Sequence, residues 1–302
     1  MRIALKVDVD TFRGTMEGVP ALQRLFDQFN VKATFLFSLG PDHTGRAIKR
    51  VFRRGFLEKV GRTSVTSHYG IKTLLYGTLI PGPHIGRHCA DIMRSVEQAG
   101  HETGIHTYDH ILWQDYVANR GEDWTRRQMN KARESYFDVF HHHAYTHGAA
   151  GWQMNAHAFH LEKDFGFHYA SDCRGSHPFI PVVDNKAIDC PQLPTTLPTL
   201  DEVIGCDGWT EDNVHQYILN EAKREFQHGH VYTLHAELEG MKLIPVMRRL
   251  LEAWRSEGYT IGSTQDLFAS LDINQLPKHH IEYRTITGRS GTLAVQGKGE
   301  GP

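Results

Sequence analysis

The sequence lacks several features that would assign it to a specialised class of protein. Its four cysteines have irregular spacings that fit neither a zinc ribbon nor a disulfide framework, so we expect reduced thiols (Cys89, Cys173, Cys190 and Cys206). The net charge is only -2 and the pI is near 6.9, so there is no basic excess of the kind that binds nucleic acid. These absences leave an ordinary globular protein.

Long apolar runs are also missing. No stretch reaches the roughly 18 consecutive apolar residues of a transmembrane helix. The first residues include Arg2, Lys6 and Asp8 and lack the apolar segment of a secretory signal. We therefore expect a protein that is neither membrane-spanning nor exported by that route. With 302 residues, of which 40% are hydrophobic, the chain can form one sizeable core, and we expect a single domain over residues 1–302.

Strand-like and helix-like segments alternate along most of the chain. Apolar residues recur at helical spacing in residues 19–30, 88–100, 213–229, where we expect the helix to end at Gly229, and 244–258. Strand-like runs precede or follow them in residues 3–9, 31–40, 101–106, 167–175, 230–237 and 259–264. Repeated β-then-α order predicts a parallel sheet or a barrel. The tail after about residue 279 has little periodicity, and we expect it to be flexible.

Two acidic residues end the first strand-like run. Residues i and i+2 of a strand point to the same face, about 6.6 Å apart, so Asp8 and Asp10 should project together. Burying two adjacent carboxylates is costly unless positive charge compensates them, and a divalent cation would do so. The alternative is that one of them caps the following turn and the other faces water.

Histidines supply further candidate ligands in the segment HETGIHTYDH. In an extended strand His106 and His110 would lie about 13 Å apart, too far to share an ion. On a helical turn, positions i and i+4 lie on one face, and a Zn–N bond is about 2.0 to 2.1 Å long. His101 and His106 form a less suitable pair. Since chemistry collects at the carboxyl ends of parallel strands, we expect these ligands to meet other polar residues that end strand-like runs (Asp8, Asp10, Asp172 and His235).

These motifs together resemble those of the polysaccharide deacetylase superfamily, the NodB-like metal-dependent deacetylases. The closer resemblance is to the branch of deformylases that act on undecaprenyl phosphate carrying 4-deoxy-4-formamido-L-arabinose. It rests on the segments VDVDTFRGTMEGVP, YGTLIPGPHIG, GIHTYDH, YASDCRGSHPF, QLPTTLPTLDEVIG and TLHAELEG. The resemblance implies an α/β fold with a distorted (β/α) barrel, one divalent metal ion, and release of formate to leave the 4-amino sugar used in lipid A modification.

The resemblance also implies roles for individual residues. Asp8 would be the general base and His235 the general acid, and the metal would be bound by Asp10, His106 and His110. Zinc, cobalt and manganese all suit one carboxylate and two imidazoles.

The chain departs from the superfamily at one position close to these motifs. Many members have an arginine that orients the base, whereas this chain has Gln153 after Trp152. Arg174 could replace that arginine, or it could bind the lipid phosphate. Asp172 could hold the tautomer of His235 or simply cap a turn. Trp152 is a further candidate for contact with the substrate or the catalytic groups.

A basic and apolar insertion is expected at about residues 46–88. Between Arg46 and Arg62 there are seven basic residues and one acidic residue, interleaved with apolar ones. Such a segment is typical of an interfacial element on anionic lipid. We therefore expect residues 46–80 to form a peripheral anchor on the cytoplasmic side of the bacterial inner membrane. The alternative is an amphipathic helix that packs on the barrel and exposes a basic face.

Two other functions compete with deformylation. A deacetylase of peptidoglycan or chitin-type sugars would use the same chemistry, but the missing export signal disfavours it. A non-catalytic, metal-stabilised barrel that binds carbohydrate or lipid would keep the metal ligands but would have no use for Asp8 and His235. The histidine cluster at residues 141–147 has no accompanying carboxylate, and we do not expect it to be a native metal site.

Overall fold

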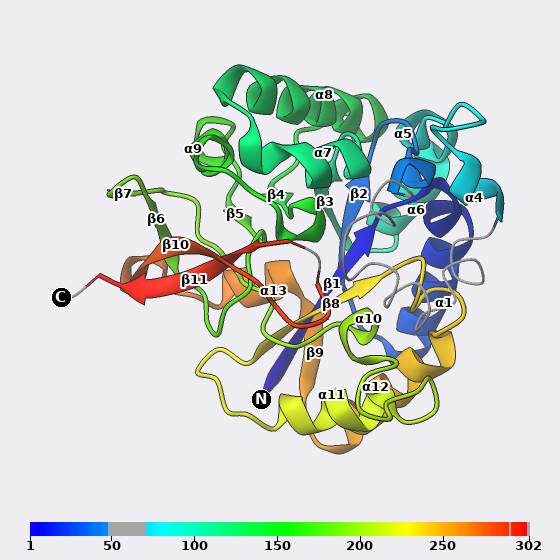
Figure 1. The fold of residues 1–302 in the computed structure, drawn as a ribbon. Helices are drawn as coiled ribbons and strands as arrows, with labels where there is room; N and C mark the ends of the chain where they lie inside the picture. Colours follow the sequence, from blue (N-terminus) through cyan, green and yellow to red (C-terminus); the bar gives the residue numbers. More distant parts are fainter. Residues whose placement is uncertain (48–70, 290, 301–302) are drawn as a thin grey trace.

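The computed structural model describes residues 1–47, 71–289 and 291–300. In these residues a parallel sheet of seven strands has the order β5-β4-β3-β2-β1-β8, with β9 paired to β1 (Figure 1). The strands are β1 (Arg2–Val9), β2 (Thr34–Ser38), β3 (Glu102–Thr107), β4 (Thr146–His147), β5 (Tyr169–Ala170), β8 (His230–His235) and β9 (Thr260–Ser263).

The sheet curves into an incomplete barrel around β1. One edge of β1 pairs with β9 near its start and with β2 near its end, and the other edge pairs with β8. An extended segment at residues 192–197 spans the space between β5 and β8. The Leu193 N–H donates to the Ala170 carbonyl at 2.8 Å, and the Thr196 N–H donates to the Val231 carbonyl at 3.1 Å. This irregular closure confirms the predicted α/β fold with a distorted barrel.

Helices cover the outside of the sheet (Figure 1). The longer ones are α1 (Val19–Phe29), α6 (Ala90–Gln98), α8 (Glu122–Phe140), α9 (Ala156–Asp164), α11 (Val214–Ala222) and α12 (Ile244–Ser256). Shorter turns are η1 (Gly14–Gly18), α4 (Ile71–Leu75), α5 (Ile85–His88), α7 (His110–Tyr116), η3 (Val117–Asn119), η4 (Ala150–Trp152), α10 (Leu200–Val203), α13 (Thr264–Ala269) and η5 (Ile273–Gln275). The predicted helices at residues 19–30, 88–100 and 244–258 are present.

One predicted helix boundary is wrong. Helix α11 ends at Ala222 rather than at Gly229. The His230 Nε2 contacts the Arg224 carbonyl at 2.8 Å, and Gly229 turns the chain with a φ of 77°. The residues between Ala222 and Gly229 are therefore folded back toward the start of β8 instead of continuing the helix.

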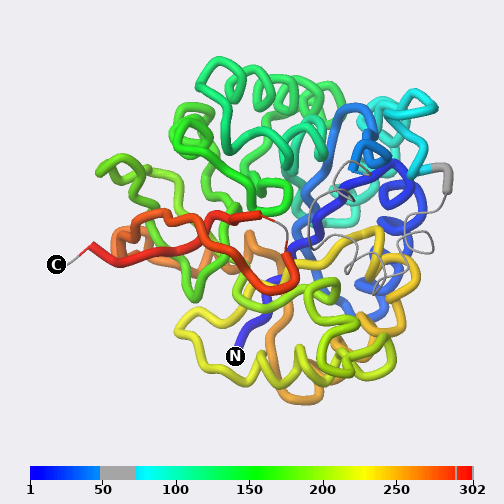
Figure 2. Tube along the Cα trace, viewed as in Figure 1, coloured from blue at the N-terminus to red at the C-terminus, as the bar shows by residue number. Residues whose placement is uncertain are grey.

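The C-terminal region contains regular strands, which its lack of periodicity did not indicate, and its flexibility stays a prediction. Strands β10 (Lys278–Arg284) and β11 (Leu293–Gly299) form an antiparallel pair, coloured orange to red in Figure 2. They join β6 (Ile180–Val183) and β7 (Lys186–Ala187) in a four-stranded sheet of order β11-β10-β6-β7. The partner of β10 in this sheet is β6, about a hundred residues earlier in the chain, so local periodicity cannot reveal the pairing.

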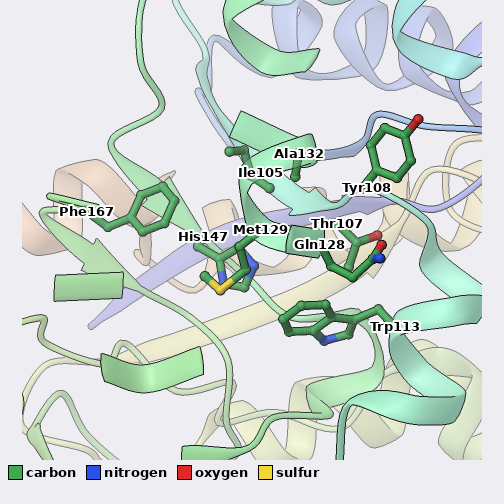
Figure 3. Close-up of a pocket in the computed structure, with 9 residues that line it drawn as sticks. All are labelled: Ile105, Thr107, Tyr108, Trp113, Gln128, Met129, Ala132, His147 and Phe167. Atoms are coloured by element: carbon green, nitrogen blue, oxygen red, sulfur yellow. The ribbon is translucent and has the colours of Figure 1, made fainter. Parts of the chain in front are cut away.

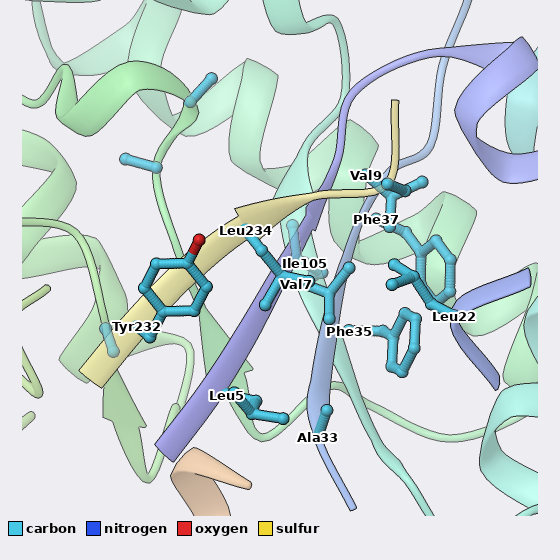
Figure 4. Close-up of a cluster of buried hydrophobic side chains, with 14 of the residues drawn as sticks. Leu5, Val7, Val9, Leu22, Ala33, Phe35, Phe37, Ile105, Tyr232 and Leu234 are labelled. Carbon is cyan, nitrogen blue, oxygen red and sulfur yellow. The ribbon is translucent and has the colours of Figure 1, made fainter. Parts of the chain in front are cut away.

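Successive side chains of β1 point alternately to the hydrophobic core, under the helices, and to the interior of the barrel. Leu5, Val7 and Val9 face the helices and pack with residues such as Phe35, Phe37 and Leu22 (Figure 4). Burying each side chain of this kind contributes about 1.5 to 3 kcal/mol. Because side chains alternate in a strand, Lys6 and Asp8 project from the opposite face into the barrel. Polar residues therefore enter the interior on a strand whose other face holds the core together.

The basic and apolar insertion is described only in part. Helices α4 and α5 lie within it, whereas Arg50, Arg53, Arg54 and the other residues of 48–70 lie outside the described residues. In the part of the chain that the structure describes, no helix has the length and apolar character needed to cross a membrane.

Candidate metal centre

Asp10 follows the end of β1, and a buried glutamate fixes its backbone. Glu237 lies just beyond β8, and its Oε1 accepts hydrogen bonds from the N–H groups of Asp10 at 2.9 Å and Thr11 at 2.7 Å. Gly14 is required here, because a Cβ at this position would overlap the Glu237 carboxylate. The pKa of Glu237 is raised well above its usual value, first by burial and then by the neighbouring Asp10 carboxylate.

His106 and His110 come from two different elements. His106 lies in β3, and His110 is the first residue of α7. Asp109 caps that helix, since one carboxylate oxygen accepts from the Leu112 N–H at 3.0 Å and the other lies 2.6 Å from His43 Nδ1. The strand-to-helix turn therefore brings the two histidines together. The helical turn that the spacing suggested is not the reason for their proximity.

Asp10, His106 and His110 converge on one point. His106 Nε2 lies 3.2 Å from Asp10 Oδ1, and His110 Nε2 lies 3.4 Å from Asp10 Oδ2. The ligand atoms of all three residues lie within 4.8 Å of one another. His106 Nδ1 contacts the Gly148 carbonyl at 2.6 Å and donates to it, which leaves the Nε2 lone pair directed toward Asp10.

The chemistry of this site suits a divalent ion. Burial alone would raise the pKa of Asp10, but positive charge at His110 and His106 lowers it, and a cation bound between these side chains would act in the same direction. Asp10 Oδ1 is buried and has no hydrogen-bond partner within the described ranges. A carboxylate oxygen that faces an imidazole lone pair without a hydrogen bond is better satisfied by a cation. One carboxylate and two imidazoles form a suitable donor set.

Asp8 has a positively charged partner that the sequence analysis did not identify. The Lys6 Nζ lies 3.2 Å from Asp8 Oδ2 and also donates to the Ser171 carbonyl at 3.1 Å. Lys6 is fully buried, and its ammonium group lies 5.5 Å from the centre of the Trp152 ring. The i, i+2 spacing used for Asp8 and Asp10 would also have placed Lys6 on this face. Asp8 Oδ1 is buried without a hydrogen-bond partner in the described part of the chain.

His235 ends β8 beside these carboxylates. Its Cα is in register with that of Asp8 on the neighbouring strand. Its N–H donates to Glu239 Oε2 at 2.9 Å, and its buried Nδ1 has no hydrogen-bond partner among the residues that the structure describes. Burial raises the pKa of Glu239 to about 7, although His235 opposes that shift. Glu237 and Glu239 were also missed, although both stand in the HAELEG segment that follows the strand.

Asp172 does not hold His235. Its oxygens contact His147 Nδ1 at 2.8 Å, the Ala149 N–H at 2.7 Å and Gln192 Nε2 at 2.9 Å. Glu162 of α9 joins this network, with its Oε1 2.9 Å from His147 Nδ1. The expectation that Asp172 could hold the tautomer of His235 is therefore wrong. Its side chain belongs to the hydrogen-bond network between β4 and α9.

The same network contains a second group of residues close enough to hold a metal ion, namely His147, Glu162 and Asp172. Their polar atoms bond one another and Gln192, whose Nε2 donates to both carboxyl groups. Burial and then the Asp172 carboxylate raise the pKa of Glu162 well above its usual value. We therefore interpret this group as a structural hydrogen-bond network.

Arg174 and its neighbours lie next to the site without contacting Asp8. Arg174 Nη1 pairs with Glu202 Oε1 at 2.5 Å, and its guanidinium carbon lies 5.0 Å from the Trp152 ring centre. Trp152 is buried, and its indole N–H donates to Thr195 Oγ1 at 3.1 Å. Gln153 Nε2 donates to the Thr292 carbonyl at 2.7 Å, so this side chain is directed toward the C-terminal sheet. Lys6, rather than Arg174 or Gln153, supplies the charge beside Asp8.

A separate apolar pocket lies on the other face of β3 (Figure 3). Ile105 and Thr107 line it, and they alternate with His106 along the strand. Met129 and Ala132 of α8 form another wall. The pocket therefore belongs to the packing between β3 and α8 and is distinct from the candidate metal centre.

Comparisons with solved structures define the class of this fold. A protein from Mycobacterium smegmatis assigned as a polysaccharide deacetylase has a TM-score of 0.64 and 18% identity, covering 95% of this chain and 93% of the other. A probable polysaccharide deacetylase from Pseudomonas aeruginosa PAO1 has a TM-score of 0.57 and 14% identity, covering 89% of each chain. Likeness at such identities concerns the fold alone, and the fold is that of the polysaccharide deacetylases.

Sequence relatives identify the family within this class. A probable 4-deoxy-4-formamido-L-arabinose-phosphoundecaprenol deformylase ArnD from Shewanella sediminis (strain HAW-EB3) is 34% identical over 295 residues, 98% of this chain and 94% of the relative. Another of the same name, from Wigglesworthia glossinidia brevipalpis, is 33% identical over 286 residues, 94% of this chain and 99% of the relative. The chain belongs to this ArnD deformylase family, which confirms the resemblance seen in its motifs. No family model matches it.

Proposed function

We propose that this chain is a metal-dependent hydrolase that deformylates undecaprenyl-phosphate-linked 4-deoxy-4-formamido-L-arabinose. Its products would be formate and the 4-amino-4-deoxy-L-arabinose lipid used in lipid A modification and in resistance to cationic peptides such as polymyxin. The substrate follows from the names of the relatives. The observation that carries the chemistry is the presence of two proton-transfer candidates, Asp8 and His235, in register on adjacent strands beside three metal-ligand candidates.

Asp10, His106 and His110 would hold one divalent ion, such as zinc, cobalt or manganese. When bound, the ion would polarise the formyl carbonyl and make a water molecule more acidic. The hydrogen bond from His106 to the Gly148 carbonyl and the hydrogen bonds of Glu237 to the backbone at Asp10 would keep these ligands oriented.

Asp8 is suited to accept the proton of the attacking water. It is ionically paired with Lys6 and is not needed as a metal ligand, so one of its oxygens is available. His235 lies on the neighbouring strand and would donate a proton to the sugar nitrogen as the C–N bond breaks. Each such proton transfer typically contributes about 10² to 10⁴ in rate. Glu239 would hold the backbone of His235 through the bond to its N–H.

The substrate's polyprenyl chain would remain in the bilayer, so the protein would work as a peripheral protein at an anionic membrane surface, on the cytoplasmic side. The support for this part is the basic and apolar composition of residues 46–80. Most of that segment lies outside the described residues, so this support comes from the sequence alone.

The experiment that tests the proposal compares two synthetic lipid-linked sugars that differ only in the acyl group. Formate release from the formamido sugar is measured beside acetate release from the acetamido sugar, with peptidoglycan and chitin oligomers as further substrates. The proposal predicts formate release with a kcat/KM well above that for every acetylated compound. Preference for an acetylated sugar would identify a deacetylase, and failure to cleave any of these compounds would favour a non-catalytic barrel.

A further inference from the structure

Two imidazoles face each other at the side of the molecule formed by the four-stranded sheet. His177 lies in the loop between β5 and β6, and His279 is the second residue of β10. Their Nε2 atoms are 3.2 Å apart, and their ring centroids are 5.0 Å apart. Both side chains are partly buried. Neither residue contributes to the candidate metal centre or to the network around Asp172.

The surrounding hydrogen bonds determine which ring nitrogen of His177 carries hydrogen. Gln296 Oε1 accepts from the Ser176 N–H at 2.8 Å and from Ser176 Oγ at 3.2 Å. The other end of this amide, Nε2, lies 2.9 Å from His177 Nε2 and must donate to it. His177 Nδ1 then donates to Ser176 Oγ at 2.9 Å. His177 Nε2 therefore carries no hydrogen and presents a lone pair.

His279 is oriented in the same way. Its Nδ1 lies 2.9 Å from the Gly297 carbonyl, which can only accept, so Nδ1 carries the hydrogen. In the neutral ring the Nε2 of His279 is then also a lone pair. The two Nε2 atoms, neither of which carries hydrogen in its neutral ring, thus lie 3.2 Å apart; the lone pair of His177 accepts from Gln296, whereas that of His279 has no such donor among the described residues.

The geometry is closer to that of a metal site than to that of a shared proton. Two nitrogens on a tetrahedral ion with bonds of about 2.0 to 2.1 Å are separated by about 3.3 Å. Metal-binding histidines commonly donate their other N–H to an oxygen, as both do here.

We propose that His177 and His279 bind a divalent transition-metal ion. His228 and Glu225 line a pocket with His177, but in the described part of the chain they do not form a group of three ligands with the pair, so water would complete the coordination of the ion. Imidazole ligands favour zinc, copper and nickel among the divalent ions. The ion would replace the hydrogen bond between Gln296 and His177, and its binding does not depend on the proposed deformylase activity.

Such an ion would connect two parts of the chain that are distant in sequence, namely the loop before β6 and strand β10. Binding to the folded state alone stabilises a protein in proportion to the logarithm of the free ion concentration. The site would therefore couple the stability of the C-terminal sheet to metal supply.

The test counts bound ions in untagged protein that has been stripped with chelator and dialysed against zinc. We expect two ions per wild-type chain and one in His177→Gln/His279→Gln, in which glutamine keeps hydrogen-bonding capacity. His106→Ala should retain the ion at the His177 site, and zinc should still raise its Tm. A matched control, His142→Gln/His143→Gln, changes two other histidines and should bind as many ions as wild type.

The proposal is overturned if His177→Gln/His279→Gln binds as many zinc ions as wild type. It is equally overturned if zinc raises the Tm of His106→Ala and of the triple variant His106→Ala/His177→Gln/His279→Gln by the same amount, since the pair would then only share a proton. Should the double variant not fold, His279→Gln alone replaces it, because this change leaves the bonds of His177 with Ser176 and Gln296 in place.

Discussion

Replacing Lys6 with methionine removes the cation beside Asp8 while keeping most of the buried volume of the side chain. At 3.2 Å and an effective dielectric constant of about 20, the attraction between the two charges is about 5 kcal/mol. Removing one member of a buried ion pair generally destabilises a protein by about 3 to 5 kcal/mol, because the other charge remains uncompensated. Both side chains are buried, so solvent screening is small.

We therefore expect Lys6→Met to lower the free energy of unfolding by about 3 to 5 kcal/mol in urea titrations. Turnover should fall by about 10² or more, since a displaced Asp8 loses its role in proton transfer. Lys6→Arg keeps the charge and should recover much of both losses. Lys32→Met is the matched control, because this lysine instead donates to the Ala99 carbonyl, and the variant should retain the activity of wild type.

A double-mutant cycle separates the pair from other effects of the substitution. Asp8→Asn/Lys6→Met carries neither charge, so it should be more stable than Lys6→Met alone. The reasoning is refuted if Lys6→Met retains wild-type kcat. It is also refuted if Lys6→Met costs as much stability in the Asp8→Asn variant as it does in the wild-type protein.

Three further predictions concern catalysis, pH and the membrane. Asp8→Asn and His235→Ala should fold and bind metal but lose formate release by about 10² to 10⁴; near-normal kcat would refute either assignment. Burial, with a smaller contribution from Lys32, lowers the pKa of His101 to about 4, so protonation favours the unfolded state and stability falls from about pH 6.5 to 4. The free energy of unfolding should fall by about 3 kcal/mol over this pH range. The variant His101→Asn keeps an acceptor for the Ala33 N–H and should not show this fall. Equal pH dependence of unfolding in the variant and the wild-type protein would contradict the prediction. Changing Arg50, Arg53 and Arg54 to Glu should abolish co-sedimentation with anionic liposomes at low salt, and unchanged binding would exclude the proposed anchor.

The sequence predicted the cluster of candidate metal ligands better than its surroundings. The proximity of Asp10 and His106 could be predicted because strand periodicity and the ends of parallel strands restrict where such side chains meet. The contact of Asp172 with His147 could not be predicted, because His147 lies in a two-residue strand and Asp172 lies beyond another, and strands this short show no periodicity that assigns a side chain to one face. Lys6 was accessible to the same periodicity argument and was overlooked within an apolar run.

In the fold, too, local features were predicted and contacts between distant segments were not. Helices such as α1 and α12 have strong apolar periodicity and were predicted within a few residues. The pairing of β10 with β6 was missed because it joins segments about a hundred residues apart, and no local pattern specifies the partner of a strand. The end of α11 depends on the contact between His230 and the Arg224 carbonyl, which also arises only in the folded chain.

The central claim is that a metal ion bound by Asp10, His106 and His110 is required for catalysis. Its most direct test measures formate release while a divalent metal is added back stepwise to metal-free protein. Wild-type protein stripped with chelator should release no formate from the lipid-linked formamido sugar, and zinc, cobalt or manganese should restore release. His177→Gln/His279→Gln should recover in the same way, whereas His106→Ala should stay inactive at every metal concentration. Full activity in the stripped wild-type protein, or restored activity in His106→Ala, would contradict the assignment of Asp10, His106 and His110 as the catalytic metal site.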